Sequence, residues 1–240
     1  MKSIGLIFAG GSGVRMNIGS RPKQFLKLHG KEIIIHTIEQ FENHPEIDGI
    51  VIVCIESWID YLGKALKKFG IIKVKRIVPG GKNGQASIYN GLKAIHEMKE
   101  ENSIVLVHDG VRPLITPDLI SENIKVAKEK RCAISASPAI ETIVCLDSEA
   151  RINSITDRSK CLYAKAPQTF IFKDLWTAHN KAVHEGKTDF IDTASLMQYY
   201  GYELNIVHCS PENIKITTPS DFYIFRALYE AKESSQIFGL

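Results

Sequence analysis

The sequence of 240 residues contains no apolar run long enough to cross a membrane. A membrane-spanning helix needs about 18 or more consecutive apolar residues, and no segment approaches that length. The short apolar run after Lys2 ends in Gly10-Gly11, without the length or the small-residue cleavage site of a secretory signal. We therefore expect a protein with no membrane partner.

Cysteine is scarce and shows no pairing pattern. Five cysteines are present, none forms a C-x-x-C pair, and the eight histidines show no H-E-x-x-H spacing. An odd number of cysteines, mostly in apolar surroundings, is typical of buried thiols in a reducing compartment. The sequence therefore predicts a cytoplasmic location. The five positions are Cys54, Cys132, Cys145, Cys161 and Cys209.

The chain also lacks a strong net charge. Its formal charge is +3, its pI is near 8.5, and no run of lysine or arginine exceeds two residues. Binding to nucleic acid usually requires a marked basic patch, so we expect no nucleic-acid partner. A local cationic pocket for a phosphorylated small molecule fits better. With 44% hydrophobic residues the chain can bury one substantial core, which favours a single domain over residues 1–240.

Apolar residues recur alternately in the pattern of buried strands and in that of amphipathic helices. Ile50 to Ile55 is a β-branched run typical of a buried parallel strand, whereas Ile34, Ile38 and Phe41 have helical spacing. Ser57 is a candidate N-cap, and Thr116-Pro117 opens a helix in the cap-then-proline order. This alternation predicts an α/β fold with a mainly parallel sheet between two layers of helices. Expected strands cover residues 4–8, 50–55, 71–78, 104–108 and 203–208, and expected helices lie near 34–41, 59–69, 88–95, 173–185 and 192–200, after Pro117 and at the C-terminus.

The alternation breaks after Ser137. Residues 138–172 are strand-like, with a turn near Asp147 to Arg151. We interpret this segment as a protruding β-hairpin arm that is too small to be a domain. An isolated two-stranded arm is unstable without a partner, so the arm also predicts a homodimer.

A glycine-rich loop follows the first expected strand. It reads Phe8-Ala9-Gly10-Gly11-Ser12-Gly13-Val14-Arg15-Met16, and Arg21-Pro22-Lys23-Gln24-Phe25 comes shortly after it. Glycines let backbone N–H groups crowd around an anion, and Arg15 and Lys23 add two fixed cations, which suits a triphosphate. The spacing fits neither a Walker loop nor a dinucleotide fingerprint. The plainer alternative is a turn with incidental glycines.

Three further segments should meet this loop at the carboxyl ends of the strands, where ligands gather in open α/β sheets. They are Pro79 to Ser87, Val107 to Pro113, and Lys215. Asp109 follows an apolar strand, where a lone carboxylate is costly unless it is paired or binds a metal such as Mg²⁺; a turn or N-cap aspartate is the alternative. Arg112 could clamp an anionic substrate or form a surface ion pair, and His108 is more typical of a structural residue.

Six motifs in register carry a family resemblance. They are A-G-G-x-G-x-R-M, P-K-Q-F, G-G-x-x-x-x-x-S-I, H-D-x-x-R-P, A-P-Q-T-F and N-I-K-I-T. From Ile4 to Phe222 the chain resembles the cytidylyltransferases that activate methylerythritol phosphate or ribitol 5-phosphate with CTP. The resemblance implies a Rossmann-like three-layer α/β/α nucleotidyltransferase fold. It also implies in-line attack of a polyol phosphate on the α-phosphorus of CTP, with loss of pyrophosphate.

The resemblance also implies roles for individual residues. Arg15, Lys23 and Lys215 would neutralise phosphate charge as catalytic residues, and Asp109 would hold Mg²⁺. Arg112 would bind the acceptor, and Thr142 and Arg158 would reach the acceptor site of the partner subunit from the arm. The nucleotide would be bound by Ala9, Gly10, Gly11, Gly13, Gly81, Lys82 and Ser87.

The sequence departs from the family pattern mainly on the acceptor side. Gly84 stands where many relatives carry an arginine, which leaves nucleotide contacts to neighbours such as Lys82 and leaves base preference open. Glu141, Ala166 and Ile191 replace a usual aspartate and two usual threonines. These changes argue against methylerythritol phosphate as the acceptor. Other segments, such as Thr142-Ile143-Val144, look like the ribitol-phosphate branch, whereas Asp192-Thr193-Ala194-Ser195-Leu196 looks more like the isoprenoid branch. The resemblance on balance favours D-ribitol 5-phosphate, giving a CDP-alditol for a surface polymer. The alternatives are 2-C-methyl-D-erythritol 4-phosphate in isoprenoid synthesis and a non-catalytic nucleotide-binding module. A molybdopterin guanylyltransferase is disfavoured by Pro22-Lys23-Gln24 and by the H-D-x-x-R-P block.

Overall fold

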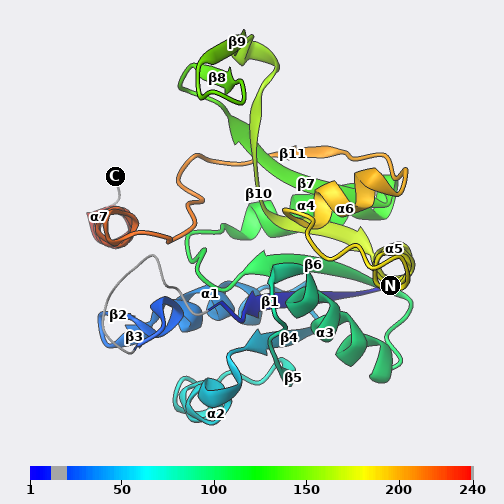
Figure 1. The fold of residues 1–240 in the computed structure, drawn as a ribbon. Coiled ribbons are helices and arrows are strands. Elements are labelled where there is room, and N and C mark those ends of the chain that lie inside the picture. The colour runs from blue at the N-terminus through cyan, green and yellow to red at the C-terminus, as the bar shows by residue number, and fades with distance from the viewer. Residues whose placement is uncertain (12–20, 239–240) are drawn as a thin grey trace.

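The computed structural model describes residues 1–11 and 21–238 (Figure 1). The strands are β1 (Lys2–Ala9), β2 (Lys27–Leu28), β3 (Lys31–Glu32), β4 (Gly49–Cys54), β5 (Val74–Pro79), β6 (Ser103–Asp109), β7 (Cys132–Pro138), β8 (Ile143–Leu146), β9 (Ile152–Thr156), β10 (Leu162–Ile171) and β11 (Ile206–His208). The α-helices are α1 (Ile33–Glu42), α2 (Ile59–Lys68), α3 (Gly84–Glu97), α4 (Pro117–Lys130), α5 (Phe172–His184), α6 (Thr193–Tyr199) and α7 (Pro219–Phe238). Short 3-10 helices are η2 (Lys23–Phe25), η3 (Glu56–Trp58) and η4 (Arg158–Lys160).

The centre of the fold is a mixed, mainly parallel sheet. Among the described residues it has seven strands in the order β11-β7-β10-β6-β1-β4-β5. Neighbouring strands are parallel except β10, which runs antiparallel to both β6 and β7. Every residue of β4 and of β6 is buried, which explains why these strands are continuous apolar runs rather than alternating ones. The predicted α/β fold is confirmed.

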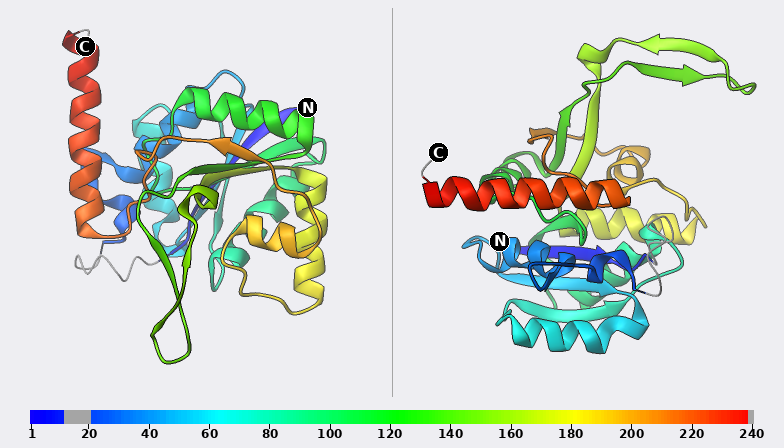
Figure 2. Two further views of the ribbon diagram at one scale, coloured as in Figure 1. Left: turned by 90° about the horizontal axis from the view of Figure 1, so that it is seen from above. Right: turned by 90° about the vertical axis from the view of Figure 1, so that its left-hand side faces the viewer.

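Helices cover both faces of this sheet. On one face, Ile7, Ile52 and Leu106 pack against α1, α2 and α4. On the other, Leu6 and Val107 pack against α3, α5 and α6. Successive side chains of a strand point to opposite faces, so each β-branched strand contributes to both cores. The views in Figures 1 and 2 agree with this three-layer arrangement.

The arm is shorter than the predicted segment 138–172. Strands β8 and β9 form a separate antiparallel hairpin that projects from the body (Figures 1 and 2). The predicted turn is confirmed, since Oδ1 of Asp147 accepts hydrogen bonds from the backbone N–H groups of Glu149 and Arg151. From Leu162 the chain returns to the central sheet as β10, because Thr169 and Phe170 alternate between its two buried faces and pair with β6 and β7.

The sequence predicted the starts of α2 and β5 wrongly. Ser57 is not the N-cap of α2: the 3-10 helix η3 precedes it, and Trp58 stands at the cap without a side-chain bond to the described backbone. Trp58 is held there by stacking on Phe25, with ring centroids 4.5 Å apart. The strand expected from residue 71 begins at Val74, because Ile72 and Lys73 donate their backbone N–H groups to the Glu42 carboxylate instead. By contrast, the Thr116 cap is confirmed, with Oγ1 accepting from Leu119 N at 3.3 Å.

A small satellite core fixes the C-terminal segment. It contains Leu28, Ile33, Val111, Ile216 and Phe225. Phe225 belongs to α7, which therefore docks beside the β2–β3 hairpin and α1, while Val111 and Ile216 lie next to residues of the expected site. Among the helices that the structure describes, none is both long and apolar enough to span a bilayer.

Two glycines in surface helices test this packing. In α3 a Cβ on Gly91 would lie 2.3 Å from Cδ1 of Leu6 and 3.0 Å from Cγ2 of Val53, and both side chains are fully buried. In α2 a Cβ on Gly63 would meet nothing within 4 Å. We expect Gly91→Ala to lower the free energy of unfolding by about 1–3 kcal/mol through overpacking. Gly63→Ala should raise it by about 1 kcal/mol through helix propensity. Urea unfolding measures both, and equal effects would contradict the assigned packing of α3 on β1.

Candidate active site

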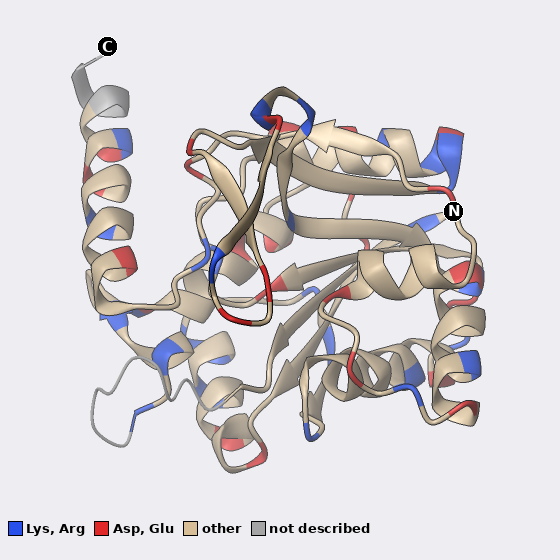
Figure 3. Ribbon diagram, turned by 45° about the horizontal axis from the view of Figure 1, so that its top comes forward, with Lys and Arg blue, Asp and Glu red and all other residues tan. Residues whose placement is uncertain are grey.

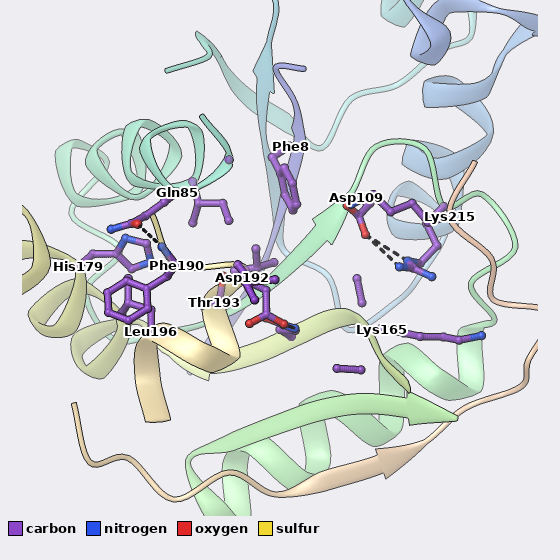
Figure 4. A pocket seen from close by; sticks show the side chains of 18 residues that line it. Phe8, Gln85, Asp109, Lys165, His179, Phe190, Asp192, Thr193, Leu196 and Lys215 are labelled. Atoms are coloured by element: carbon purple, nitrogen blue, oxygen red, sulfur yellow. Dashed lines mark hydrogen bonds and ion pairs between the residues drawn. The ribbon is translucent and has the colours of Figure 1, made fainter. Parts of the chain in front are cut away.

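A pocket of about 350 Å³ opens beside the carboxyl ends of β1 and β6 (Figure 4). Phe8, Val107 and Asp109 lie at or near the carboxyl ends of these strands, α3 contributes Gly84, Gln85 and Ile88, and β10 contributes the segment around Ala166. The remaining lining residues come from the turn after β6, from α5, from the segment that opens α6 and from the segment before α7: Arg112, His179, Phe190, Ile191, Asp192, Thr193, Leu196 and Lys215. The pocket lies where parallel-sheet proteins bind ligands.

Asp109 is the charged centre of one end of the pocket. It is 5% exposed, and its Oδ1 lies 2.6 Å from Nζ of Lys215. Its Oδ2 lies 3.2 Å from both Nε and Nη2 of Arg112. Burial alone would raise the pKa of Asp109, but the charges of Lys215 and Arg112 outweigh burial and hold the pKa below the usual range of an aspartate. Sequence reasoning placed all three residues at one site, and the structure brings them into contact.

Arg112 is buried and anchored on both sides of its guanidinium. Besides Asp109, it donates from Nη1 to the backbone carbonyl of Asn213 at 2.6 Å. The backbone carbonyl of Arg112 lies 3.1 Å from Nε2 of His108, a fully buried residue of β6. Burial lowers the pKa of His108 to about 4, so the imidazole is neutral and donates this bond. The prediction that His108 is structural agrees with this position.

The described start of the first glycine loop, up to Gly11, is held by a residue that the sequence prediction left without a role. Gln24 is 1% exposed, and its Nε2 donates to the carbonyls of Ala9 at 2.7 Å and Gly11 at 3.1 Å. The P-K-Q-F motif therefore places Lys23 beside the loop while its glutamine holds the loop in shape. In the sequence, Gln24 was marked only as a member of the P-K-Q-F motif. Gly13 and Arg15 lie outside the described residues.

The second glycine loop packs directly against the first. A Cβ on Gly10 would lie 3.2 Å from Cα of Gly80, and a Cβ on Gly81 would lie 2.5 Å from Cβ of Ala86. The Ser87 hydroxyl accepts from Gly81 N at 3.0 Å and donates to the Asn83 carbonyl at 2.8 Å. Ser87 therefore shapes the loop around Gly81, and Lys82 is exposed beside it.

Three polar residues missed by the sequence prediction hold the segment that closes the far end of the pocket. Gln85 bridges the carbonyl of Lys187 and the backbone N–H of Phe190. Gln168 donates to the Asp192 carboxylate at 2.7 Å and accepts from Ala194 N at 2.9 Å. Asp192 in turn caps α6 in a capping box with Ser195. Polar residues at otherwise buried strand and helix positions are the sequence signal for such bridges.

The pocket carries more positive than negative side chains, whereas the two signs are mixed over the rest of the chain (Figure 3). Lysine and arginine alternate with acidic residues along the rest of the chain (Figure 3). Among the described residues that line the pocket, the charged side chains are Lys165, Arg112 and Lys215 and the two carboxylates of Asp109 and Asp192. Burial lowers the pKa of Lys165, whose Nζ donates to the backbone carbonyl of Pro211 at 2.8 Å. The excess of positive charge suits an anionic ligand.

The arm residues Thr142 and Arg158 do not join this pocket within the described part of a single chain. They precede β8 and follow β9, and neither lines the pocket. Arg158 instead donates from Nη1 to the carbonyl of Ile140 at 2.8 Å.

In the cluster with Arg112 and Lys215, Asp109 is the carboxylate that could bind a metal ion. Among the described residues no group of three or more His, Cys, Asp or Glu side chains could hold a metal ion. Mg²⁺ in nucleotide enzymes commonly takes one or two carboxylates, with phosphate oxygens and water as its other ligands. A carboxylate has about four lone-pair sites, so Asp109 can accept a metal without losing both cation contacts. The residues present therefore fit Mg²⁺ whose other ligands are nucleotide phosphates and water.

Comparisons with known proteins show the family of the chain. Residues 4–230 match the family described as IspD: 2-C-methyl-D-erythritol 4-phosphate cytidylyltransferase. A protein of Vibrio parahaemolyticus named ribitol-5-phosphate cytidylyltransferase is 49% identical over 99% of this chain and 100% of its own length. One of Streptococcus agalactiae serotype III with the same name is 47% identical over 99% of this chain and 100% of its own length.

Both acceptor names occur among relatives at 35% identity. A 2-C-methyl-D-erythritol 4-phosphate cytidylyltransferase of Syntrophus aciditrophicus is 35% identical over 97% of both chains. Among solved structures, 4-diphosphocytidyl-2C-methyl-D-erythritol synthase from Anaerococcus prevotii superposes with a TM-score of 0.82 at 25% identity, covering 95% of this chain and 96% of that one.

Two buried histidines give the fold a testable pH dependence. His179 lines the pocket at 1% exposure, and neither ring nitrogen has a hydrogen-bond partner in the described part of the chain. Burial lowers its pKa to about 4, as it does for His108. Between pH 6.5 and 4 these two histidines bind protons in the unfolded chain but stay neutral in the folded chain. The free energy of unfolding therefore decreases as the pH falls through this window. Each histidine contributes a slope of about 1.4 kcal/mol per pH unit.

We expect His179→Phe to reduce the slope of the free energy of unfolding against pH by about 1.4 kcal/mol per unit between pH 4.5 and 6. Phenylalanine keeps a flat ring beside Tyr89, whose ring centroid lies 6.2 Å from that of His179. Denaturant unfolding at several pH values measures the slope. An unchanged slope would show that His179 is not held neutral by burial.

Proposed function

The chain belongs to the 2-C-methyl-D-erythritol 4-phosphate cytidylyltransferase family and is a cytidylyltransferase; from this premise we propose that it transfers CMP from CTP to D-ribitol 5-phosphate. The observation that carries the acceptor is similarity over the full length. The relatives at 47% and 49% identity bear the ribitol 5-phosphate name, whereas at 35% identity one relative bears the ribitol name and another the methylerythritol name. The products would be a CDP-alditol and pyrophosphate.

The contacts of the pocket support an in-line displacement at the α-phosphorus. The acceptor phosphate is already anionic at neutral pH, because its second pKa is about 6, so no general base is needed. Lys215 and Arg112 stand at the pocket end where charge would accumulate, and Asp109 orients both through contacts of 2.6 Å and 3.2 Å. Lys23 and Arg15 would neutralise the phosphates of CTP. Catalysis then consists of positioning and charge stabilisation.

Nucleotide binding belongs to the two glycine loops in this proposal. Ala9, Gly10, Gly11 and Gly13 would wrap the triphosphate with backbone N–H groups, and the loop around Gly81 would receive the base and ribose. Mg²⁺, held by Asp109 and phosphate oxygens, would supply further neutralisation of phosphate charge.

The acceptor side carries the departures from the family pattern. Ile191 lines the pocket with a side chain that is 97% exposed, and Ala166 is buried in its wall. The side chains of Ile191 and Ala166 cannot donate a hydrogen bond to a hydroxyl group of the acceptor, whereas a threonine side chain could. The second candidate acceptor is 2-C-methyl-D-erythritol 4-phosphate, which the family description and the D-T-A-S-L sequence after Ile191 favour.

The homodimer and the cytoplasmic location are also proposals. Val144, Leu146, Ile152 and Ile155 lie opposite one another in the hairpin register and are 41%, 58%, 63% and 68% exposed. A two-stranded arm with such an apolar face needs a partner to bury it. A second copy would do so and bring Thr142 and Arg158 to the neighbouring pocket. All five cysteines lie in the described residues as free thiols, which supports a reducing compartment.

The acceptor is tested by pyrophosphate release with CTP and Mg²⁺. We expect kcat/KM for D-ribitol 5-phosphate to exceed that for 2-C-methyl-D-erythritol 4-phosphate by at least about 100-fold, because sites built for one set of hydroxyls reject others strongly. Preference for methylerythritol phosphate would contradict the proposed acceptor and leave the cytidylyl transfer intact.

The dimer is tested on the exposed arm. We expect Ile155→Asp to shift the chain from dimer to monomer in sedimentation equilibrium, because a charge cannot be buried in the apolar contact. Ile72→Asp is the control, since Ile72 is 78% exposed outside the arm. A wild-type monomer, or an unaffected dimer in the arm variant, would contradict the proposed interface.

A further inference from the structure

We propose that Asn213 is the positioning residue that holds Arg112 and Lys215 at the correct distance from the wall of the pocket that β10 forms around Ala166. Asn213 is 2% exposed and lies two residues before Lys215. It does not line the pocket itself. The inference rests on the proposed cytidylyl transfer and concerns a residue with no assigned role.

Asn213 contacts two walls of the pocket with different groups. Its backbone carbonyl accepts from Nη1 of Arg112 at 2.6 Å. Its side-chain Nδ2 donates to the backbone carbonyl of Ala166 at 2.8 Å. The first bond is available to any residue at this position, whereas the second requires a side chain with an N–H or O–H donor.

The carbonyl of Ala166 is free to accept because β10 is irregular there. The pairing of β10 with β7 shifts register between Ala164 and Gln168, so Ala166 has no place in the ladder. The bond from Asn213 ties this interruption of the strand to the C-terminal segment. The wall that carries Ala166 and Gln168 is thereby fixed against the wall that carries Arg112.

The segment around Asn213 is held at both of its ends. Asn213 N donates to the Ser210 carbonyl at 3.1 Å, and Ile216 N donates to the Val111 carbonyl at 2.9 Å. Lys215 lies between these anchors and reaches Asp109. A shift at Asn213 therefore moves the guanidinium of Arg112 and the ammonium of Lys215 together relative to β10.

The isosteric variant Asn213→Asp removes the donor without changing the volume. Its ionised carboxylate would face the Ala166 carbonyl as a second acceptor and would draw Arg112 away from Asp109. We expect the KM for the acceptor to rise at least about tenfold at pH 8, because the variant loses one buried hydrogen bond and leaves the Ala166 carbonyl without its donor, while the KM for CTP changes less than about twofold. Burial raises the pKa of such a carboxyl group, and its protonated form again donates to the carbonyl. The ratio of variant to wild-type acceptor KM should therefore fall as the pH is lowered.

Asn123→Asp is the matched control. Asn123 is fully buried, and its Nδ2 likewise donates to a backbone carbonyl, that of Leu119, at 2.8 Å, but it does not line the pocket. We expect this variant to lower the melting temperature without altering either KM.

Three results would overturn the inference. An unchanged acceptor KM in Asn213→Asp would show that the amide does not position the site. Equal losses for CTP and acceptor, without pH-dependent recovery, would show a general structural role. A wild-type enzyme without turnover on either acceptor would overturn the proposed function and this inference together, whereas active wild type with an indifferent variant would overturn the inference alone.

Discussion

The arrangement of the site depends on a carboxylate that is buried at the end of a strand. Asp109 closes β6 at 5% exposure, where an unpaired charge would be prohibitively desolvated. Two cations from different parts of the chain remove that cost. Arg112 comes from the same turn, and Lys215 comes from a segment more than a hundred residues away. The same contacts place two positive charges where an anionic substrate would lie, so the stability of the strand end and the chemistry of the pocket have one origin.

The long-range half of this cluster requires the C-terminal segment to return to the sheet. Ile216 is buried in the satellite core with Val111 and Phe225, so the residue after Lys215 and the turn after Asp109 share one apolar contact. Helix α7 therefore contributes to the site without touching it, by supplying Phe225. Loops, strands and the terminal helix are thus coupled through a few buried side chains.

Patterns confined to one segment predicted the fold well. Buried strands appear as β-branched runs, and Asp109, Arg112 and Lys215 were placed together because the carboxyl ends of parallel strands converge. Contacts that join distant segments were not predictable. The end of the arm at Leu162 depends on pairing with two strands, and the start of α2 depends on Trp58 stacking on Phe25. Gln24 and Asn213 donate to backbone carbonyls of other motifs, and a motif does not show which distant segment its side chains will contact. Each is set by tertiary packing, which overrides local preference.

The claim that Asp109 and Lys215 act as one unit is tested most directly by a double-mutant cycle on kcat/KM. Asp109→Asn and Lys215→Met each remove one side of a 2.6 Å contact. The account predicts that the double variant is within about threefold of the slower single variant, because the second change removes an interaction already lost. Losses that multiply independently would contradict it and would assign the two residues separate roles.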